Sequence, residues 1–312
     1  MQKFALVFPG QGSQKLGMLN ALAAEFPVVR ETFRQASAVL NQDMWEIAQY
    51  DGSNTLDQTQ ITQPILMTAS VAIWRLWQQQ GGPLPSIMAG HSLGEYSALV
   101  CAGVLGFADA VKLLHYRGQL MQSAVAPGLG KMAAIVGLET YQLQEICEQA
   151  AAGQIVSAAN FNCPGQTVIA GDKDAVERAM LLCKKAGARR VLPLNVSVPA
   201  HCALMQPAAN KLALELEQIK FQPAAIAVVQ NVDAEICKAP ELIKENLIKQ
   251  LYSPVLWTDS MQLIYKAGIN KVVECGPGKV LCGLIKRIEP ALLCFASDEP
   301  QSCDSAIAEV ST

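Results

Sequence analysis

Short apolar runs alternate with segments of helical periodicity along most of the chain. Runs typical of buried strands occur at residues 3–8, 227–230, 271–274 and 292–295. The segments 26–40 and 64–80, the second with Pro64 in its first turn, and a segment that begins near residue 107 have the apolar spacing of helices. This alternation predicts a mainly parallel sheet that is flanked by helices on both faces.

The middle of the chain follows a different order. Beyond a glycine-rich stretch at 127–130, the pattern predicts strands at 132–136, 155–159, 167–170 and 190–194 and helices at 139–151 and 172–186. This βαββαβ order is that of a ferredoxin-like α+β unit. We therefore expect a large α/β domain made of residues 1–127 and 198–312, with an inserted ferredoxin-like subdomain at 128–197. The polar end of the chain, from Ser297 onward, is expected to be peripheral.

One sharp turn joins a strand-like run to a helix-forming segment. Residues 90–94 read GHSLG and fit the pattern G-x-S-x-G, in which the glycines let strand and helix crowd together and the strained serine exposes its hydroxyl. The amide of Leu93, at the start of the helix, would lie beside the Ser92 oxygen. The pattern predicts a nucleophilic serine, and the plainer alternative is a glycine-rich turn with a chance serine.

Composition excludes several classes of protein. The 312 residues are 51% hydrophobic and 16% charged, which suits a compact soluble enzyme. No apolar run approaches the roughly 18 residues of a membrane span, and a net charge of −3 gives no global attraction to nucleic acid. We expect a cytoplasmic protein with neither a membrane nor a nucleic-acid partner.

The cysteines and the first glycine-rich turn narrow the chemistry further. The ten cysteines stand singly, without a C-x-x-C pair or zinc-ligand spacing, so we expect no metal site and mostly small core residues in a reducing compartment. The turn at 9–14 reads PGQGSQ and fits neither the P-loop nor the dinucleotide pattern. It can instead present bare backbone amides to a second site on the same sheet.

Arg117 lies at the edge of an apolar helical face that runs from Phe107 to Met121. A guanidinium in this position keeps its charge and needs a carboxylate or phosphate partner. One alternative is a structural ion pair or snorkelling to solvent. The other is a fork that holds the carboxylate of a substrate through two hydrogen bonds.

The chain contains three histidines. His91 should diverge from Ser92 on the opposite side of the turn, and His115 lies on the polar face of its helix, where we expect it in water. His201 is the candidate general base, because a serine hydroxyl is a poor nucleophile unless an imidazole removes its proton. No acidic residue is near His201 in sequence, so orientation by a carbonyl or amide group stays open, as does a structural role.

Together these motifs resemble one family. The chain is similar to the malonyl-CoA:acyl carrier protein transacylases in five ordered motifs: FPGQGSQ at 8–14, GHSLGE at 90–95, YRG at 116–118, SVPAH at 197–201 and ECGPG at 274–278. The resemblance implies a hydrolase-like, mainly parallel sheet with the inserted ferredoxin-like α+β subdomain. It also implies ping-pong transfer of malonyl from malonyl-CoA to the phosphopantetheine thiol of acyl carrier protein, in fatty acid biosynthesis.

The resemblance also implies roles for single residues. Ser92, activated by His201, would carry the malonyl ester, and Arg117 would bind the malonyl carboxylate. The backbone amides of Gln11 and Leu93 would form the oxyanion hole.

Further positions follow from the same resemblance. Gln250 matches the position whose main-chain carbonyl orients the histidine, which would explain the missing acidic residue. Asn160 and Asn162 would line the cleft. Ala200 stands where the family commonly has a different small or aromatic residue, and since that residue can border the acyl pocket, selectivity between malonyl and methylmalonyl stays open. No cofactor or metal is implied.

The acceptor in this family is an acidic carrier protein, so a basic patch is expected near the cleft of a monomeric enzyme. The densest basic clusters are Lys184, Lys185, Arg189, Arg190, Lys286 and Arg287, although such clusters are also common as plain solvated surface. Two other functions stay open. A serine thioesterase or hydrolase would use the same Ser–His pair but leave Arg117 without a purpose. A non-catalytic carrier-protein binding subunit would not need Ser92 and His201.

Overall fold

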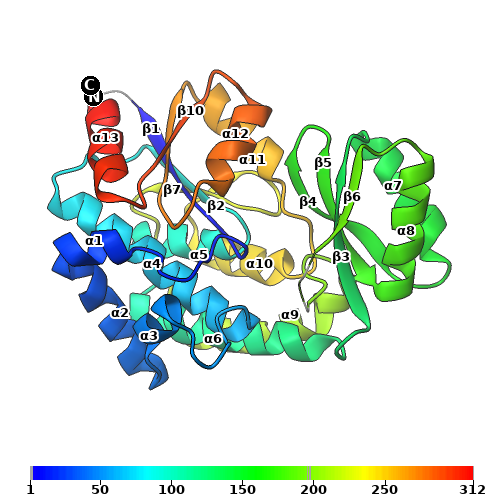
Figure 1. Cartoon of the computed structure of the whole chain (residues 1–312), viewed down its shortest axis with the longest axis horizontal. Coiled ribbons are helices and arrows are strands. Elements are labelled where there is room, and N and C mark those ends of the chain that lie inside the picture. The colour runs from blue at the N-terminus through cyan, green and yellow to red at the C-terminus, as the bar shows by residue number, and fades with distance from the viewer. Residues whose placement is uncertain (1–2, 195, 197, 312) are drawn as a thin grey trace.

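The computed structural model describes residues 3–194, 196 and 198–311 (Figure 1). Ser197, the first residue of the SVPAH motif, lies outside the described residues. In chain order the elements are β1 (Phe4–Phe8), α1 (Asn20–Glu25), α2 (Pro27–Leu40), α3 (Met44–Gln49), α4 (Thr59–Gln79), β2 (Ile87–Gly90), α5 (Leu93–Cys101), α6 (Phe107–Ala124), β3 (Gly130–Val136), α7 (Thr140–Ala151), β4 (Val156–Cys163), β5 (Gln166–Asp172), α8 (Lys173–Lys185), β6 (Arg190–Pro193), η1 (Ala203–Met205), α9 (Gln206–Gln218), β7 (Ala227–Val229), β8 (Ile236–Cys237), α10 (Pro240–Gln250), α11 (Trp257–Lys266), β9 (Lys271–Glu274), α12 (Val280–Ile288), β10 (Leu293–Ala296) and α13 (Pro300–Ser311).

The larger sheet has six strands in the order β10-β9-β1-β2-β7-β8. Neighbours from β10 to β7 pair in parallel, and β8 pairs antiparallel with β7. Leu6 and Phe8 of β1 pack into the core that includes α4, α5 and α6, whereas Ala5 and Val7 pack into the core that includes α11 and α12. Both faces of this sheet are therefore covered, and the predicted α/β class is confirmed.

The smaller sheet has the order β4-β5-β3-β6 and is antiparallel throughout. Figure 1 shows α7 and α8 against one face of this sheet. Ile135 and Ile169 pack with residues of these two helices, whereas Met132 and Val168 pack with Cys202. This is the predicted ferredoxin-like arrangement, set between its own helices and the rest of the molecule. Its strands lie within 128–197, and the exact boundaries of the two domains stay a prediction.

The helix predicted at 64–80 begins earlier, at Thr59, so Pro64 lies inside α4. Proline has no N–H to donate to the carbonyl four residues before it. His115 Nδ1 lies 2.9 Å from that carbonyl, on Gln60, and supplies the missing hydrogen bond. The expectation of a solvated His115 is wrong: the side chain is half-buried and links α6 to α4.

Two other segments differ from the expectation. The strand predicted at 155–159 continues further, to Cys163. Its pairing with β5 shifts register twice, and Phe161 donates its N–H to the Val255 carbonyl. The peripheral tail instead forms α13, which buries Cys303, Ala306 and Val310. Within the described ranges no helix combines the length and apolar character needed to span a bilayer.

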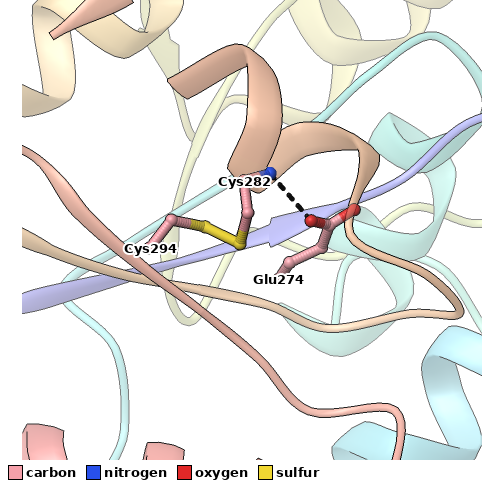
Figure 2. Close-up of side chains that lie close together, drawn as sticks. All are labelled: Glu274, Cys282 and Cys294. Carbon is pink, nitrogen blue, oxygen red and sulfur yellow. Dashed lines mark hydrogen bonds between the residues drawn. A yellow bond between two sulfur atoms is a disulfide. The ribbon is translucent and has the colours of Figure 1, made fainter. Parts of the chain in front are cut away.

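A disulfide joins Cys282 on α12 to Cys294 on β10 (Figure 2). The two residues are 12 positions apart in sequence, with Cα atoms 5.1 Å apart, because α12 folds back beside the strand that follows it. The expectation that the cysteines are mostly small core residues does not extend to this pair, which is bonded and only partly buried.

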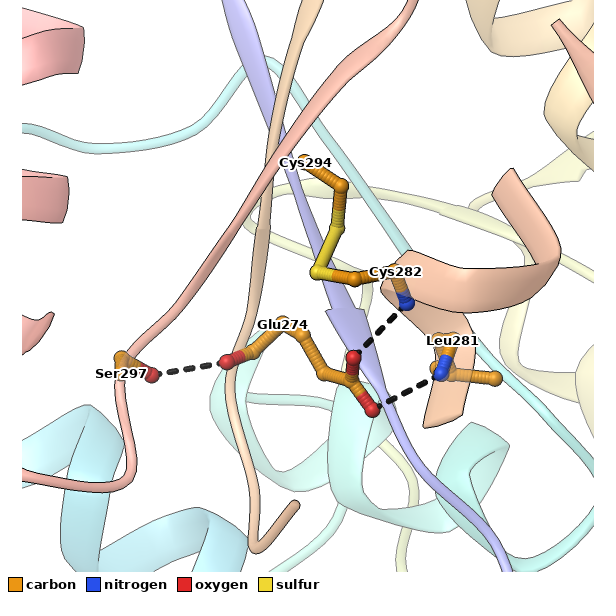
Figure 3. Close-up of a disulfide and its surroundings, with 5 residues drawn as sticks. All are labelled: Glu274, Leu281, Cys282, Cys294 and Ser297. Atoms are coloured by element: carbon orange, nitrogen blue, oxygen red, sulfur yellow. Dashed lines mark hydrogen bonds between the residues drawn. A yellow bond between two sulfur atoms is a disulfide. The ribbon is translucent and has the colours of Figure 1, made fainter. Parts of the chain in front are cut away.

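Glu274 ends β9 beside the disulfide (Figure 3). Its carboxylate oxygens accept the N–H groups of Leu281 and Cys282, at 3.0 and 2.8 Å, at the start of α12, where the helix dipole favours negative charge. Burial raises the pKa of this carboxyl to about 7. Ligand atoms of Glu274, Cys282 and Cys294 lie within 4.8 Å of one another, but both sulfurs and both oxygens are already bonded. The expectation of a metal-free protein stays a prediction.

Candidate active site

The turn from β2 to α5 has the geometry that its glycines require. Ser92 has φ 52° and ψ −109°, a strained conformation for a residue with a side chain. A Cβ on Gly90 would lie 1.9 Å from the carbonyl carbon of Gly94, and one on Gly94 would lie 2.0 Å from the Phe8 oxygen. Only glycine fits at either position. The first glycine-rich turn therefore lies in direct contact with the turn at Ser92, residues 90–94, which we call the elbow.

Asn231, just after β7, is hydrogen-bonded to the backbone of the elbow through its side-chain amide. Its Oδ1 accepts the Ser92 N–H at 2.7 Å and its Nδ2 donates to the Gly90 carbonyl at 2.7 Å. The amide therefore bridges the residues on either side of His91. We call these two hydrogen bonds the clamp of Asn231. The backbone N–H of Asn231 donates to Glu95 Oε2 at 3.1 Å, so the clamp is linked to the first turn of α5.

His201, in the segment between β6 and η1, contacts Ser92 directly. Ser92 Oγ lies 2.7 Å from His201 Nε2, and His201 Nδ1 lies 2.7 Å from the Gln250 carbonyl. A carbonyl only accepts, so Nδ1 carries the hydrogen and Nε2 presents its lone pair to the serine hydroxyl. Burial, and then the positive charge of Arg117, lower the pKa of His201 to about 3. The imidazole is thus neutral and free to accept a proton.

Arg117 is 1% exposed and lies over the Tyr96 ring. Its Nη1 donates to Gln63 Oε1 at 2.7 Å and its Nη2 to Gln250 Oε1 at 2.9 Å. Within the described part of the chain no carboxylate lies within 4.0 Å of the guanidinium. Neither an internal ion pair nor snorkelling describes this side chain. A buried cation steadied by neutral amides and an aromatic ring, with no ion-pair partner among the described residues, can take up an anion from outside.

Ser92, His201, Arg117 and Gln63 line one cavity of about 550 Å³. Its walls also include Gln11, Leu93, Asn160 and Ala200. Among the described residues the backbone N–H groups of Gln11 and Leu93 have no hydrogen-bond partner. Asn162 does not line the cavity; its Oδ1 lies 2.8 Å from Nε2 of His91. His91 points to this asparagine and to Trp257 rather than to the Ser92 hydroxyl.

Sequence reasoning missed three polar residues of this site: Gln63, Glu95 and Asn231. Asn231 follows an apolar strand, and polar residues at the carboxyl end of a parallel strand are a usual mark of a site. Glu95 lies within the GHSLGE motif, on the buried side of its helix. Gln63 carried no signal beyond being polar in an apolar helix.

Known proteins are similar to this chain over nearly its whole length. The acyl transferase domain family matches residues 5–287. The malonyl CoA-acyl carrier protein transacylases of Salmonella typhimurium and Bacillus subtilis are 55% and 41% identical to the chain, covering 99% and 98% of it and 100% and 97% of their own lengths.

Solved structures of related proteins are similar to this chain as well. An acyl carrier protein S-malonyltransferase from Vibrio cholerae superposes with a TM-score of 0.96 at 55% identity, covering 97% of this chain and 99% of its own. A malonyl-transacylase in complex with its type II PKS acyl-carrier protein gives a TM-score of 0.98 at 54% identity, covering 99% and 100%. The chain therefore belongs to the malonyl-CoA:acyl carrier protein transacylase family.

Proposed function

We propose that the protein transfers malonyl from malonyl-CoA to the phosphopantetheine thiol of an acyl carrier protein, through an ester on Ser92, in fatty acid biosynthesis. The observation that carries the proposal is one cavity that holds both the Ser92–His201 pair and the unpaired cation of Arg117. Relatives of this chain are named for the same reaction, and one is solved with a carrier protein.

The first half-reaction follows from the hydrogen bonds. His201 Nε2 takes the hydroxyl proton as Ser92 Oγ attacks the thioester carbonyl, and the Gln250 carbonyl steadies the imidazolium that forms. The unpartnered amides of Gln11 and Leu93 would receive the oxyanion, a contribution of about 10²- to 10³-fold per donor. Collapse of this intermediate breaks the C–S bond, and the CoA sulfur leaves with the proton from His201.

The second half-reaction runs the same steps in reverse order. His201 accepts the proton of the carrier thiol, the sulfur attacks the malonyl ester, and Ser92 Oγ leaves with that proton. Arg117 holds the malonyl carboxylate in both halves, so the reacting carbonyl stays over the serine. No cofactor is needed for either step.

A thioesterase would use the same pair but pass the acyl group to water. A thioesterase would not need a buried cation beside the acyl group. A malonyl group, in contrast, carries a carboxylate that can pair with the guanidinium of Arg117. The arrangement of Arg117 therefore favours the transferase over the hydrolase and over a non-catalytic binding subunit.

The decisive experiment is the intact mass of the protein after brief exposure to malonyl-CoA without acceptor. We expect a gain of one malonyl group in the parent protein and none in Ser92→Ala. Steady release of free CoA without an adduct would indicate a hydrolase instead. No adduct and no released CoA would contradict the choice of malonyl-CoA as donor.

The carrier protein is proposed to dock on a basic surface made of Arg189, Arg190, Lys286 and Arg287. Arg190 and Gln166 pair with opposite sides of Val136 in the small sheet, and Arg287 donates to Gln166 Oε1. Two basic clusters far apart in sequence thus adjoin, and Gln166 lies two residues along β5 from Val168, which pairs with Asn160 of the cavity. Lys184 and Lys185 lie at the end of α8 on the outer layer.

A monomeric state and a cytoplasmic location stay predictions.

A further inference from the structure

The side chain of Gln250 lies at the centre of the buried network behind Ser92. Its Nε2 donates to the Ser92 carbonyl at 3.0 Å and to Glu95 Oε2 at 2.8 Å, and its Oε1 accepts from Arg117. Both N–H bonds are used, and the oxygen faces the guanidinium. A flipped amide would instead point N–H groups at Arg117, which has no acceptor to offer.

Glu95 sets the direction of this amide. Its side chain is fully buried in the first turn of α5. One carboxyl oxygen, Oε2, accepts from both Gln250 and Asn231. Because an oxygen acceptor and the Ser92 carbonyl both face the same end of the amide, only the NH₂ end of Gln250 fits there.

Glu95 does not neutralise Arg117. No ion pair joins the two among the described residues, since the Gln250 amide is hydrogen-bonded to both. Burial raises the pKa of Glu95 to about 8, so the group is mostly protonated near pH 7 and adds little negative charge. The cation of Arg117 is left for a ligand.

We propose that Glu95 is a positioning residue for acyl-group selectivity: it fixes the Gln250 amide so that an uncharged oxygen steadies Arg117 and the guanidinium keeps its charge for the malonyl carboxylate. The proposal rests on the proposed function. It assigns a task to the side chain of Gln250 that is separate from the task of its main-chain carbonyl on His201.

Three variants test the idea: Glu95→Leu, Glu95→Gln and Gln250→Glu. Leucine removes the acceptor and frees the amide to turn. Glutamine retains an oxygen for the same hydrogen bonds and serves as the conservative rescue. The last variant keeps the main-chain carbonyl on His201 but sets a carboxylate against Arg117.

The measurement is single-turnover acylation of Ser92 by malonyl-CoA and by acetyl-CoA, as a function of substrate concentration. We expect the malonyl-to-acetyl preference to fall by roughly tenfold to a hundredfold in Glu95→Leu and in Gln250→Glu. The change should appear mainly in the concentration of malonyl-CoA needed for half-saturation. Glu95→Gln should keep most of the preference.

The proposal is overturned if Glu95→Leu and Gln250→Glu keep the parent's preference or lose both substrates equally, or if Glu95→Gln falls as far as Glu95→Leu. Thermal unfolding checks that each variant folds, and Gln250→Glu, which is isosteric, decides the outcome if Glu95→Leu does not fold. A parent protein that forms no malonyl adduct would instead contradict the proposed function itself.

Discussion

At the scale of single residues, the site depends on a buried cation with no ion-pair partner among the described residues, and on a histidine that burial keeps neutral. Arg117 is steadied by two amide oxygens, and His201 is kept neutral beside it. The buried guanidinium costs folding free energy because desolvation disfavours a charged form, and the same effect keeps His201 neutral. Each also prepares a chemical role, one as an anion site and the other as a base.

Replacing Arg117 by Ala tests the anion site. We expect kcat/KM for malonyl transfer to fall by about 10²-fold or more, since a charge-assisted pair in a buried site is lost. Transfer of acetyl, which has no carboxylate, should fall much less. Parallel assays with malonyl-CoA and acetyl-CoA measure both, and an equal loss on the two substrates would return Arg117 to a structural role.

The lowered pKa of His201 makes a prediction for activity. A histidine that titrates near 6.5 would lose its base function between pH 7 and 5, whereas a group with a pKa of about 3 stays neutral over that range. We expect kcat/KM for Ser92 acylation to be flat from pH 7 to 5. A fall in kcat/KM centred near pH 6.5 would show that His201 binds a proton in the folded protein at its ordinary pKa, and would contradict the prediction.

The same shift affects stability. Below pH 6.5 the unfolded chain binds a proton on His201 that the folded protein does not, so this group lowers the free energy of unfolding as pH falls, by about 1.4 kcal/mol per pH unit. Buried Glu95 has the opposite slope between pH 4.5 and 8. Denaturant titrations of the parent and His201→Gln isolate the histidine, and their stability difference should shift by about 2 kcal/mol from pH 6.5 to 5. A constant difference would contradict the prediction.

At the scale of elements, the site depends on close approach of backbones. Gly94 of α5 touches the end of β1, and Asn231 after β7 holds the turn after β2. Three neighbouring strands, β1, β2 and β7, thus converge on the elbow from their carboxyl ends, the usual location of sites in open parallel sheets.

Gly94→Ala tests this approach. The added Cβ would lie 2.0 Å from the Phe8 carbonyl oxygen, so strand and helix must separate, and we expect a loss of stability of about 2 kcal/mol or more together with loss of acylation. Gly283→Ala on α12 is the matched control, because nothing lies within 4 Å of its Cβ; it should stabilise by about 0.5–1 kcal/mol. Chemical denaturation with intact-mass analysis measures both variants. An acylating, stable Gly94→Ala would show that the contact is not required.

At the scale of the whole molecule, the small sheet is joined to the large one beside the site. β4 exchanges backbone hydrogen bonds with Val255 through Ala159 and Phe161, each 2.9 Å, and Asn162 bonds His91 next to the nucleophile. The same docking brings Arg287 of the large domain to Gln166 of the insertion. The basic surface therefore exists only when both sheets are in place.

Arg190→Glu combined with Arg287→Glu tests that surface as the docking site for the carrier protein. We expect KM for the carrier protein to rise several-fold and its dependence on salt to weaken, because surface charges act mainly on association. Acylation by malonyl-CoA should change less. Lys112→Glu with Lys220→Glu, an equal change of net charge on α6 and after α9, is the control, and an effect as large in the control would point to net charge alone.

Local sequence determined the features that depend on neighbouring residues. The strand, glycine turn and helix around Ser92 follow from residues 86–98, and the βαββαβ order of the insertion follows from its apolar pattern, because periodicity and backbone freedom are local properties. The tertiary structure alone decided the partners of Arg117, the clamp of Asn231, the bond from His115 to α4 and the pairing of Cys282 with Cys294. These contacts join residues from different elements, and which polar groups meet is fixed only when the sheets and helices pack.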